Sequence, residues 1–303
     1  MRKLLLSTLA TFFVGYSLVI PTFLFAQVNP PSPYLNPDCK YRTHIYIGSG
    51  KNTFIYNFRD EAINFFDLFK LHGVEAKALN GVNDIGTFKD SLESFEWQHC
   101  DTLGHEFQDR IVIVMLGHGA KRAEGGHEML IFDAINGRDN FINVRDMVEA
   151  IRHAIRPADR VPITIMVSSC YSGRWIEVFN QSLKRYGYSV NVFTASGPEE
   201  PQWSMLYPQG FRAGISGFLA RESAFQQKVV DINSVADLNA MFSAGALIGT
   251  RSREQSGYRF AFPGLPPGLK SAFGRIVGGV RQIYVETAQE LRSPLPQGYP
   301  MLK

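Results

Sequence analysis

The sequence has little cysteine and almost no excess of charge, and both shortages exclude classes of function. None of its three cysteines belongs to a Cys-x-x-Cys pair, which argues against disulfide exchange. Basic side chains exceed acidic ones by only three, two of them near the N-terminus, so nothing predicts nucleic-acid binding. His105, His127 and His153 lack the spacing of metal ligands, and we expect no metal and no cofactor.

The first 41 residues differ from the rest of the chain. Arg2 and Lys3 precede an uncharged stretch from Leu4 to Ala26, which is the pattern of an export signal. The apolar run is also long enough for an uncleaved membrane anchor, so residues 1–26 are predicted to be one or the other. The proline-rich residues 27–41 are predicted to form a linker. We therefore expect an exported protein that is periplasmic, secreted or anchored outside the cytoplasm.

An odd number of cysteines in an exported chain indicates one disulfide and one thiol kept for chemistry. Cys39 and Cys100 are the candidates to pair, because the predicted elements place both near the N-terminal edge of a sheet. Cys170 follows a predicted strand and belongs at the opposite edge. In the loop-entropy view, a bridge between Cys39 and Cys100 would contribute about 4 kcal/mol. The alternative is three reduced thiols.

Alternating strand and helix patterns predict an α/β fold for residues 42–262. The predicted strands are residues 44–47, 74–79, 111–116, 161–167, 190–195 and 258–262, with a hairpin at 129–142. The predicted helices are residues 57–71, 84–99, 143–155, 174–186, 211–222 and 235–247. Such an order favours a mostly parallel sheet with helices on both faces, and active residues beyond the carboxyl ends of the strands. Residues 263–303 are predicted to be a helix, 269–291, and a tail.

Two predicted strands lead into reactive side chains. The apolar run 111–116 precedes His118 and Gly119, and the run 163–167 shortly precedes Cys170. Neighbouring parallel strands would bring both ends to one rim of the sheet. A thiolate is the attacking species in cysteine catalysis, and an imidazole can take its proton and later protonate the leaving amine. The amides of Gly119 and Cys170 are candidate oxyanion donors.

Each of these signals is weak by itself. Cysteine is among the most buried residue types, so Cys170 alone is more simply a structural thiol. The functional interpretation rests on two continuous apolar strands that each deliver one member of a Cys/His pair, followed by small residues.

These segments resemble the caspase and legumain superfamily of cysteine peptidases, and the legumain-like family more than the caspases. The resemblance covers most of residues 43–225, and the 52 positions from His118 to Cys170 match the caspase spacing. It implies a caspase-like three-layer sandwich with a mostly parallel six-stranded sheet. Tyr56-Asn57-Phe58-Arg59 is similar to the legumain segment in which an asparagine orients the histidine and an arginine lines the specificity pocket.

The resemblance implies roles for further residues. Asn57 would orient His118 and Arg59 would line the pocket, although an N-cap and a surface ion pair are the simpler interpretations. Ser168 stands where legumains carry an acidic pocket residue, and Asp60 replaces the usual histidine, so asparaginyl specificity is not implied. Trp203 and Ser204 lie in the loop that resembles the pocket wall, and we list them as substrate-binding candidates together with Arg59 and Ser168.

We therefore predict a cysteine endopeptidase acting on peptide or protein substrates through a Cys170 thioester. A transpeptidase or transamidase would use the same two residues, with an amine in place of water. A binding protein of the cell envelope that keeps the fold without turnover is the alternative from another class. Glu199 and Glu200 of the pocket loop could select a basic side chain in the substrate.

Overall fold

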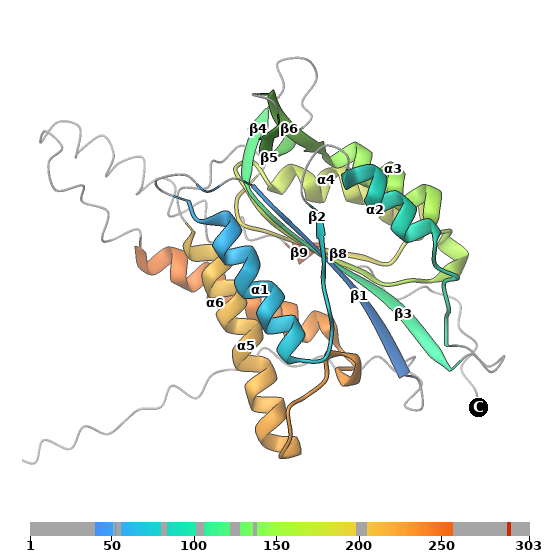
Figure 1. Cartoon of the computed structure of the whole chain (residues 1–303), viewed down its shortest axis with the longest axis vertical. Coiled ribbons are helices and arrows are strands. Elements are labelled where there is room, and N and C mark those ends of the chain that lie inside the picture. The colour runs from blue at the N-terminus through green and yellow to red at the C-terminus, as the bar shows by residue number, and fades with distance from the viewer. Residues whose placement is uncertain are drawn as a thin grey trace, which may run out of the picture.

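The computed structural model describes residues 40–50, 52, 56–79, 84–100, 106–121, 128–135, 138–197, 205–256 and 290–291. Its main sheet has six strands in the order β2-β1-β3-β7-β8-β9 (Figure 1). The strands are β1 (Lys40–Ser49), β2 (Lys77–Leu79), β3 (Phe107–Leu116), β7 (Ile163–Ser168), β8 (Val190–Thr194) and β9 (Glu290–Leu291). All pairs are parallel except β8 with β9, which is antiparallel. The predicted α/β fold with a mostly parallel sheet is confirmed, and five of its six predicted strands are seen; the sixth place in the sheet is taken by β9.

Helices cover both faces of this sheet (Figure 1). One layer holds α1 (Phe58–Leu71), α5 (Leu206–Gln226) and α6 (Leu238–Ser256), and the other holds α2 (Asp84–Glu93), α3 (Val144–Ala154) and α4 (Gly173–Ser182). Short 3-10 turns lie at Pro157–Asp159, Lys184–Tyr186 and Ile232–Ser234. The layers follow from the crossover connections between parallel strands.

Strand β3 shows why the sequence requires two helical layers. Its residues from Ile111 to Leu116 are all buried, and alternate side chains belong to different core clusters. Ile111, Ile113 and Met115 pack into the cluster with α2, α3 and α4, whereas the residues between them pack into the cluster with α1, α5 and α6. Since successive strand side chains point to opposite faces, an unbroken apolar run needs cover on both sides.

A smaller antiparallel sheet follows directly after β3. It consists of β4 (His118–Lys121), β5 (Glu128–Ile135) and β6 (Arg138–Asn143), in that order. The hairpin predicted over residues 129–142 corresponds to β5 and β6. Strand β4 was not predicted, because its four residues carry no alternating apolar pattern. Asn143 caps α3 as predicted, with its side chain accepting a hydrogen bond from the amide of Arg145 at 2.9 Å.

The boundaries of several segments differ from those we expected; the second predicted helix, for example, ends at Glu93 and not at residue 99. Strand β1 begins at Lys40, so the last two residues assigned to the linker belong to the sheet. Glu290 and Leu291 pair with β8 as a strand, although the predicted terminal helix extended to Leu291. The predicted signal or anchor, the edge strand 258–262 and the remainder of the terminal helix lie outside the described residues. Within the parts of the chain that are described, no helix is sufficiently long and apolar to cross a bilayer.

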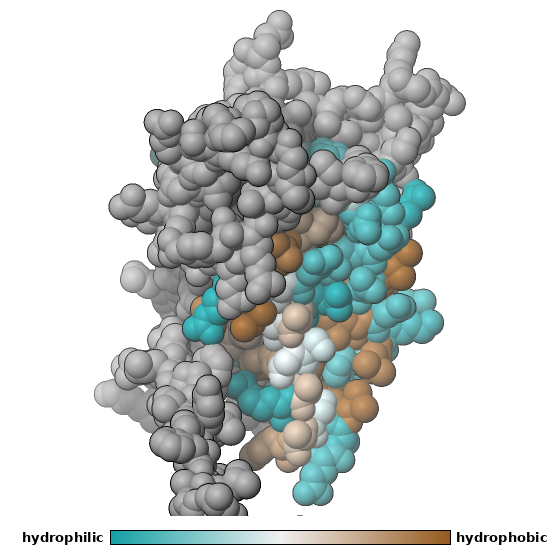
Figure 2. Space-filling model, turned by 90° about the vertical axis from the view of Figure 1, so that its left-hand side faces the viewer, coloured by the Kyte–Doolittle hydropathy of each residue, from teal (hydrophilic) through white to brown (hydrophobic). Residues whose placement is uncertain are grey.

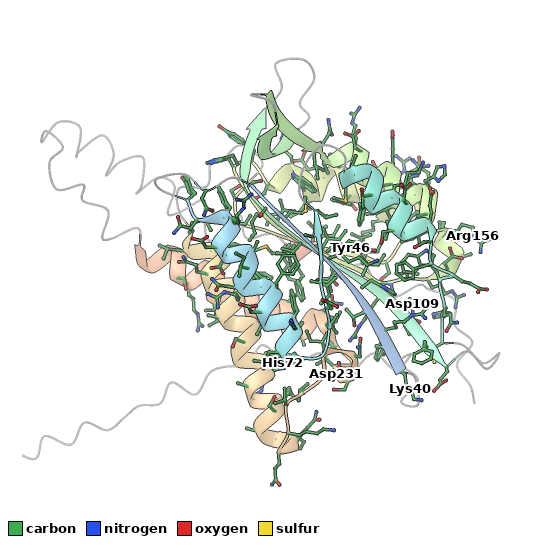
Figure 3. All side chains as sticks on the ribbon, in the orientation of Figure 1. Lys40, Tyr46, His72, Asp109, Arg156 and Asp231 are labelled. Carbon is green, nitrogen blue, oxygen red and sulfur yellow. The ribbon has the colours of Figure 1, made fainter. Side chains whose placement is uncertain are left out.

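A buried carboxylate organises the end of the sheet where β1 and β3 begin, as Figure 3 shows for Asp109 near Lys40. Asp109 is fully buried and accepts hydrogen bonds from Arg42 at 2.5 and 2.7 Å, from His44 at 3.1 Å, and from the amide of Gln98 at 2.8 Å. Burial alone would raise the pKa of Asp109, but the hydrogen bonds from His44, Arg42 and Gln98 lower it to about 2. This cluster therefore stabilises the edge of the sheet opposite the carboxyl ends of the strands.

Figure 2 shows hydrophilic and hydrophobic residues interspersed over the described part of one face. The exposed large apolar side chains are divided among several elements, including Ile63 and Leu71 of α1 and Leu247 of α6. Single exposed apolar residues of this kind are ordinary on soluble domains.

Candidate active site

The carboxyl ends of β3 and β7 lie side by side. The two strands pair in parallel, with Leu116 opposite Ser168, and the amide of Gly117 donates to the Ser168 carbonyl at 3.0 Å. His118 and Cys170 each follow two positions later. The register of the sheet thus delivers the imidazole and the thiol to one rim, as the sequence predicted.

Gly119 passes against the backbone of Cys170. A Cβ atom added at Gly119 would lie 2.8 Å from the carbonyl carbon of Cys170 and 3.0 Å from its nitrogen, and closer still to its carbonyl oxygen. Ordinary contacts between carbon atoms are about 3.5–4.0 Å, so no larger residue fits here without a shift of the backbone. The segment that carries His118 is therefore in direct contact with the segment that carries Cys170.

Cys170 lies in a tight turn between β7 and α4. The residue is reduced and partly exposed. Tyr171, directly after it, has a φ of 59°, which is the left-handed region that non-glycine residues rarely occupy. Such a conformation costs about 1–2 kcal/mol and occurs most often at functional turns. Helix α4 begins three residues after the cysteine, and the partial positive charge at its N-terminus favours a thiolate.

A network of buried serines fixes this turn to the end of β8. The amide of Ser172 donates to Oγ of Ser196 at 3.0 Å, and the amide of Ser196 donates to Oγ of Ser172 at 3.0 Å. The Ser196 hydroxyl in turn donates to the carbonyl of Ser169 at 2.8 Å. Ser172 and Ser196 are fully buried, so the backbone on either side of Cys170 is held by bonds that water does not compete for.

His118 packs against two aromatic rings from the start of α1. The ring centroids of Tyr56 and Phe58 lie 5.3 and 5.0 Å from that of His118, and both planes are nearly perpendicular to the imidazole, at 87° and 84°. The two aromatic rings are parallel to each other within 3°, with centroids 5.3 Å apart. Burial lowers the pKa of His118 from its ordinary value of 6.5, which favours a neutral imidazole able to accept a proton.

The pKa of Tyr56 also depends on Cys170. Burial raises the pKa of the Tyr56 phenol, and the charge that Cys170 carries as a thiolate raises it further. The phenol therefore stays protonated at neutral pH. Tyr56 is thus coupled to both members of the Cys/His pair, to His118 through its ring and to Cys170 through charge.

The other predicted site residues of the described chain lie around this pair. Asn57 occupies the N-cap position of α1, but its side chain is exposed and makes no capping hydrogen bond. Arg59 is exposed on the first turn of α1, and its amide donates to Asn52 at 2.8 Å. Ser168 is fully buried at the end of β7, where the alternation of side chains directs it to the α1 face of the sheet. Their predicted roles stay predictions.

The predicted substrate-binding residues Trp203 and Ser204 and the predicted disulfide partner Cys39 lie outside the described residues. Cys100 is disulfide-bonded, and Cys170 is not. Across the described part of the chain, no group of three or more histidine, cysteine or acidic side chains is arranged to hold a metal ion.

Sequence reasoning missed the aromatic and serine contacts of the site. In the sequence Tyr56 and Phe58 stand out only as neighbours of Asn57, although aromatic residues on both sides of a candidate orienting residue are a usable signal. The pairing of Ser172 with Ser196 had no local signal, because it joins two loops that are 24 positions apart.

No protein-family model and no curated protein sequence matches the chain. Among solved structures, the chain is similar to caspase-1 from Spodoptera frugiperda, with a TM-score of 0.43 and 13% identity over 63% of this chain and 74% of that chain. A TM-score of this size carries no argument, so the case for the site depends on its own geometry.

Proposed function

We propose that this protein is a cysteine endopeptidase in which Cys170 is the nucleophile and His118 the general acid and base. The observation that carries the proposal is the close approach of Gly119 to the Cys170 backbone, which sets the imidazole-bearing and thiol-bearing segments against each other at one rim. A partly exposed, reduced cysteine at the N-terminal end of a helix adds to it.

The reaction would proceed through a thioester. His118 takes the thiol proton, and the sulfur of Cys170 forms a bond with the scissile carbonyl carbon. Amides of Gly119 and Cys170 would stabilise the oxyanion of the tetrahedral intermediate. The carbon–nitrogen bond then breaks as His118 gives its proton to the leaving amine, and water, deprotonated by His118, releases the acid and restores the thiol.

We extend the proposal to the protein's family and to its location outside the cytoplasm. The resemblance around His118 and Cys170 supports membership of the caspase and legumain superfamily, and the Asn57-Arg59 segment supports the legumain-like branch. The basic and apolar N-terminal sequence supports export, either through a cleaved signal or with an anchor. A disulfide at Cys100 is in keeping with an oxidising compartment.

The proposal is tested by profiling cleavage of a peptide library with wild type and the variants Cys170→Ala and His118→Gln. We expect cleavage at defined bonds by wild type and none by Cys170→Ala, because no other residue supplies the nucleophile. Mass analysis with an added amine separates hydrolysis from transamidation. Absence of any cleaved or amine-joined product, together with a Cys170 that iodoacetamide does not modify at neutral pH, would refute the peptidase and favour a binding protein.

A further inference from the structure

We propose that the rings of Tyr56 and Phe58 form an aromatic clamp that positions His118 against Cys170, the task that we had assigned to Asn57. This inference rests on the proposed function, because it names the residues that orient the acid and base of that reaction. Both are positioning residues, which act through His118.

The contact geometry supports the clamp. Two parallel rings that both stand perpendicular to an imidazole restrict its rotation, since edge-to-face packing has a preferred angle and distance. Phe58 is 2% exposed and anchored in the core beneath α1, so the surface against which His118 rests is itself fixed. Within the described residues, no side-chain hydrogen bond to the His118 ring competes with this packing.

Asn57 lies between the two rings in the sequence but not in the packing. Its side chain is exposed, whereas its two neighbours contact the imidazole. The local conformation therefore turns the aromatic pair toward His118 and the amide side chain toward solvent.

The clamp also sets the environment of the proton that His118 carries. The rings and the strand end bury the imidazole, and burial lowers its pKa, so a loosened clamp would admit water and allow the pKa to rise toward 6.5. Burial is the cause that lowers the pKa of His118, and the phenol of Tyr56, whose ring contacts the imidazole, stays protonated over the same pH range. The predicted shift therefore reports on His118.

The test measures the rate at which iodoacetamide modifies Cys170, as a function of pH, in the full chain, with mass spectrometry to locate the modified residue. Tyr56→Leu removes one ring, and we expect the rate at pH 7 to fall about three- to tenfold, because an aromatic pair contributes at that level. We also expect the pKa of His118 itself, followed by NMR of its imidazole ring, to rise. Tyr56→Phe keeps the ring and should recover most of the rate that Tyr56→Leu loses, and Asn57→Ala should lose less than Tyr56→Leu.

The comparison of variants separates positioning from a general loss of structure. A destabilised protein would change its unfolding temperature but not the pKa of His118, and Tyr56→Phe should restore most of what Tyr56→Leu loses. The clamp is refuted if Tyr56→Leu alkylates like wild type, if Tyr56→Phe is as impaired as Tyr56→Leu, or if Asn57→Ala shows the larger loss. Alkylation needs no peptide substrate, so a clamp that behaves as expected in a protein that cleaves no peptide would overturn the peptidase proposal alone.

Discussion

Replacing Gly119 by alanine should separate the two members of the proposed dyad. The added Cβ would lie 2.8 Å from the carbonyl carbon of Cys170, where about 3.5–4.0 Å is ordinary. The atoms in the way belong to the backbone of a turn held by buried serines, so they cannot rotate aside like the end of a flexible side chain.

The size of the effect follows from that overlap. Relieving it requires the two segments to move apart by roughly 0.7–1.2 Å, judged from ordinary carbon–carbon contact. A displacement of about 1 Å in a catalytic group can lower a rate about 100-fold. Overpacking of this kind also costs about 1–3 kcal/mol of stability, which a well-buried core of this size should survive.

The assay is peptide cleavage, where a substrate has been found, alongside alkylation of Cys170 by iodoacetamide at pH 7. For Gly119→Ala we expect a fall of roughly 100-fold in kcat/KM and a slower alkylation, with a cooperative unfolding transition retained. The matched control is Gly217→Ala in α5, where an added Cβ meets nothing within 4 Å. Alanine there should leave activity unchanged and stabilise the helix by up to about 1 kcal/mol.

The geometric reasoning would fail if Gly119→Ala kept both the cleavage rate and the alkylation profile of wild type. Such a result would mean that the strand ends are not in contact in solution. A loss of activity shared equally by Gly217→Ala would refute it as well, because the effect would then not depend on the contact with Cys170.

Three further predictions concern the groups that support the site and the sheet. Asp109→Asn should lower the free energy of unfolding by about 2 kcal/mol at pH 6. The Asp109 carboxyl has a pKa of about 2 in the folded protein, so its charge stabilises the fold above about pH 4, and this contribution is lost as the pH falls toward 2. Denaturant unfolding at pH 6 and pH 2.5 should show the difference between wild type and variant shrink, and a constant difference would contradict the assignment. Ser196→Ala should lower the free energy of unfolding by about 1–3 kcal/mol and slow the alkylation of Cys170. The substitution leaves the buried amide of Ser172 and the carbonyl of Ser169 without their hydrogen bonds to the Ser196 hydroxyl. An unchanged melting temperature would show that the network is dispensable. Burial lowers the pKa of His118 below 6.5, so the unfolded chain binds a proton at this imidazole more readily than the folded one. Wild type should therefore lose stability relative to His118→Gln as the pH falls below about 6.5. Parallel curves of stability against pH for the two proteins would argue against a buried imidazole.

The framework of the fold was predictable because its signals are local. The run from Ile111 to Leu116 and its counterpart at 163–167 are apolar without interruption, a pattern that strands covered on both faces require. Since parallel strands share the direction of their carboxyl ends, the pairing of β3 with β7 places His118 and Cys170 beyond the same rim of the sheet. The strict need for glycine at position 119 was visible only as a small residue after the histidine.

The rest depended on contacts between distant segments. The residues around Asp109 in the sequence do not predict its ion pair with Arg42, which lies 67 positions earlier. Likewise the choice between Asn57 and its aromatic neighbours as partners of His118 is made by how α1 packs on the sheet, and β4 owes its existence to pairing with β5. Tertiary packing decides such details, and one sequence does not encode them in any local pattern.

The serine network that holds the cysteine turn contains only hydroxyls and backbone groups, none of which gains or loses a proton between about pH 3 and pH 11. Acid or alkali can therefore alter the charge of the thiol and the imidazole while their mounting stays rigid. A change of reactivity with pH therefore does not begin with a change of charge in the network that holds the cysteine turn.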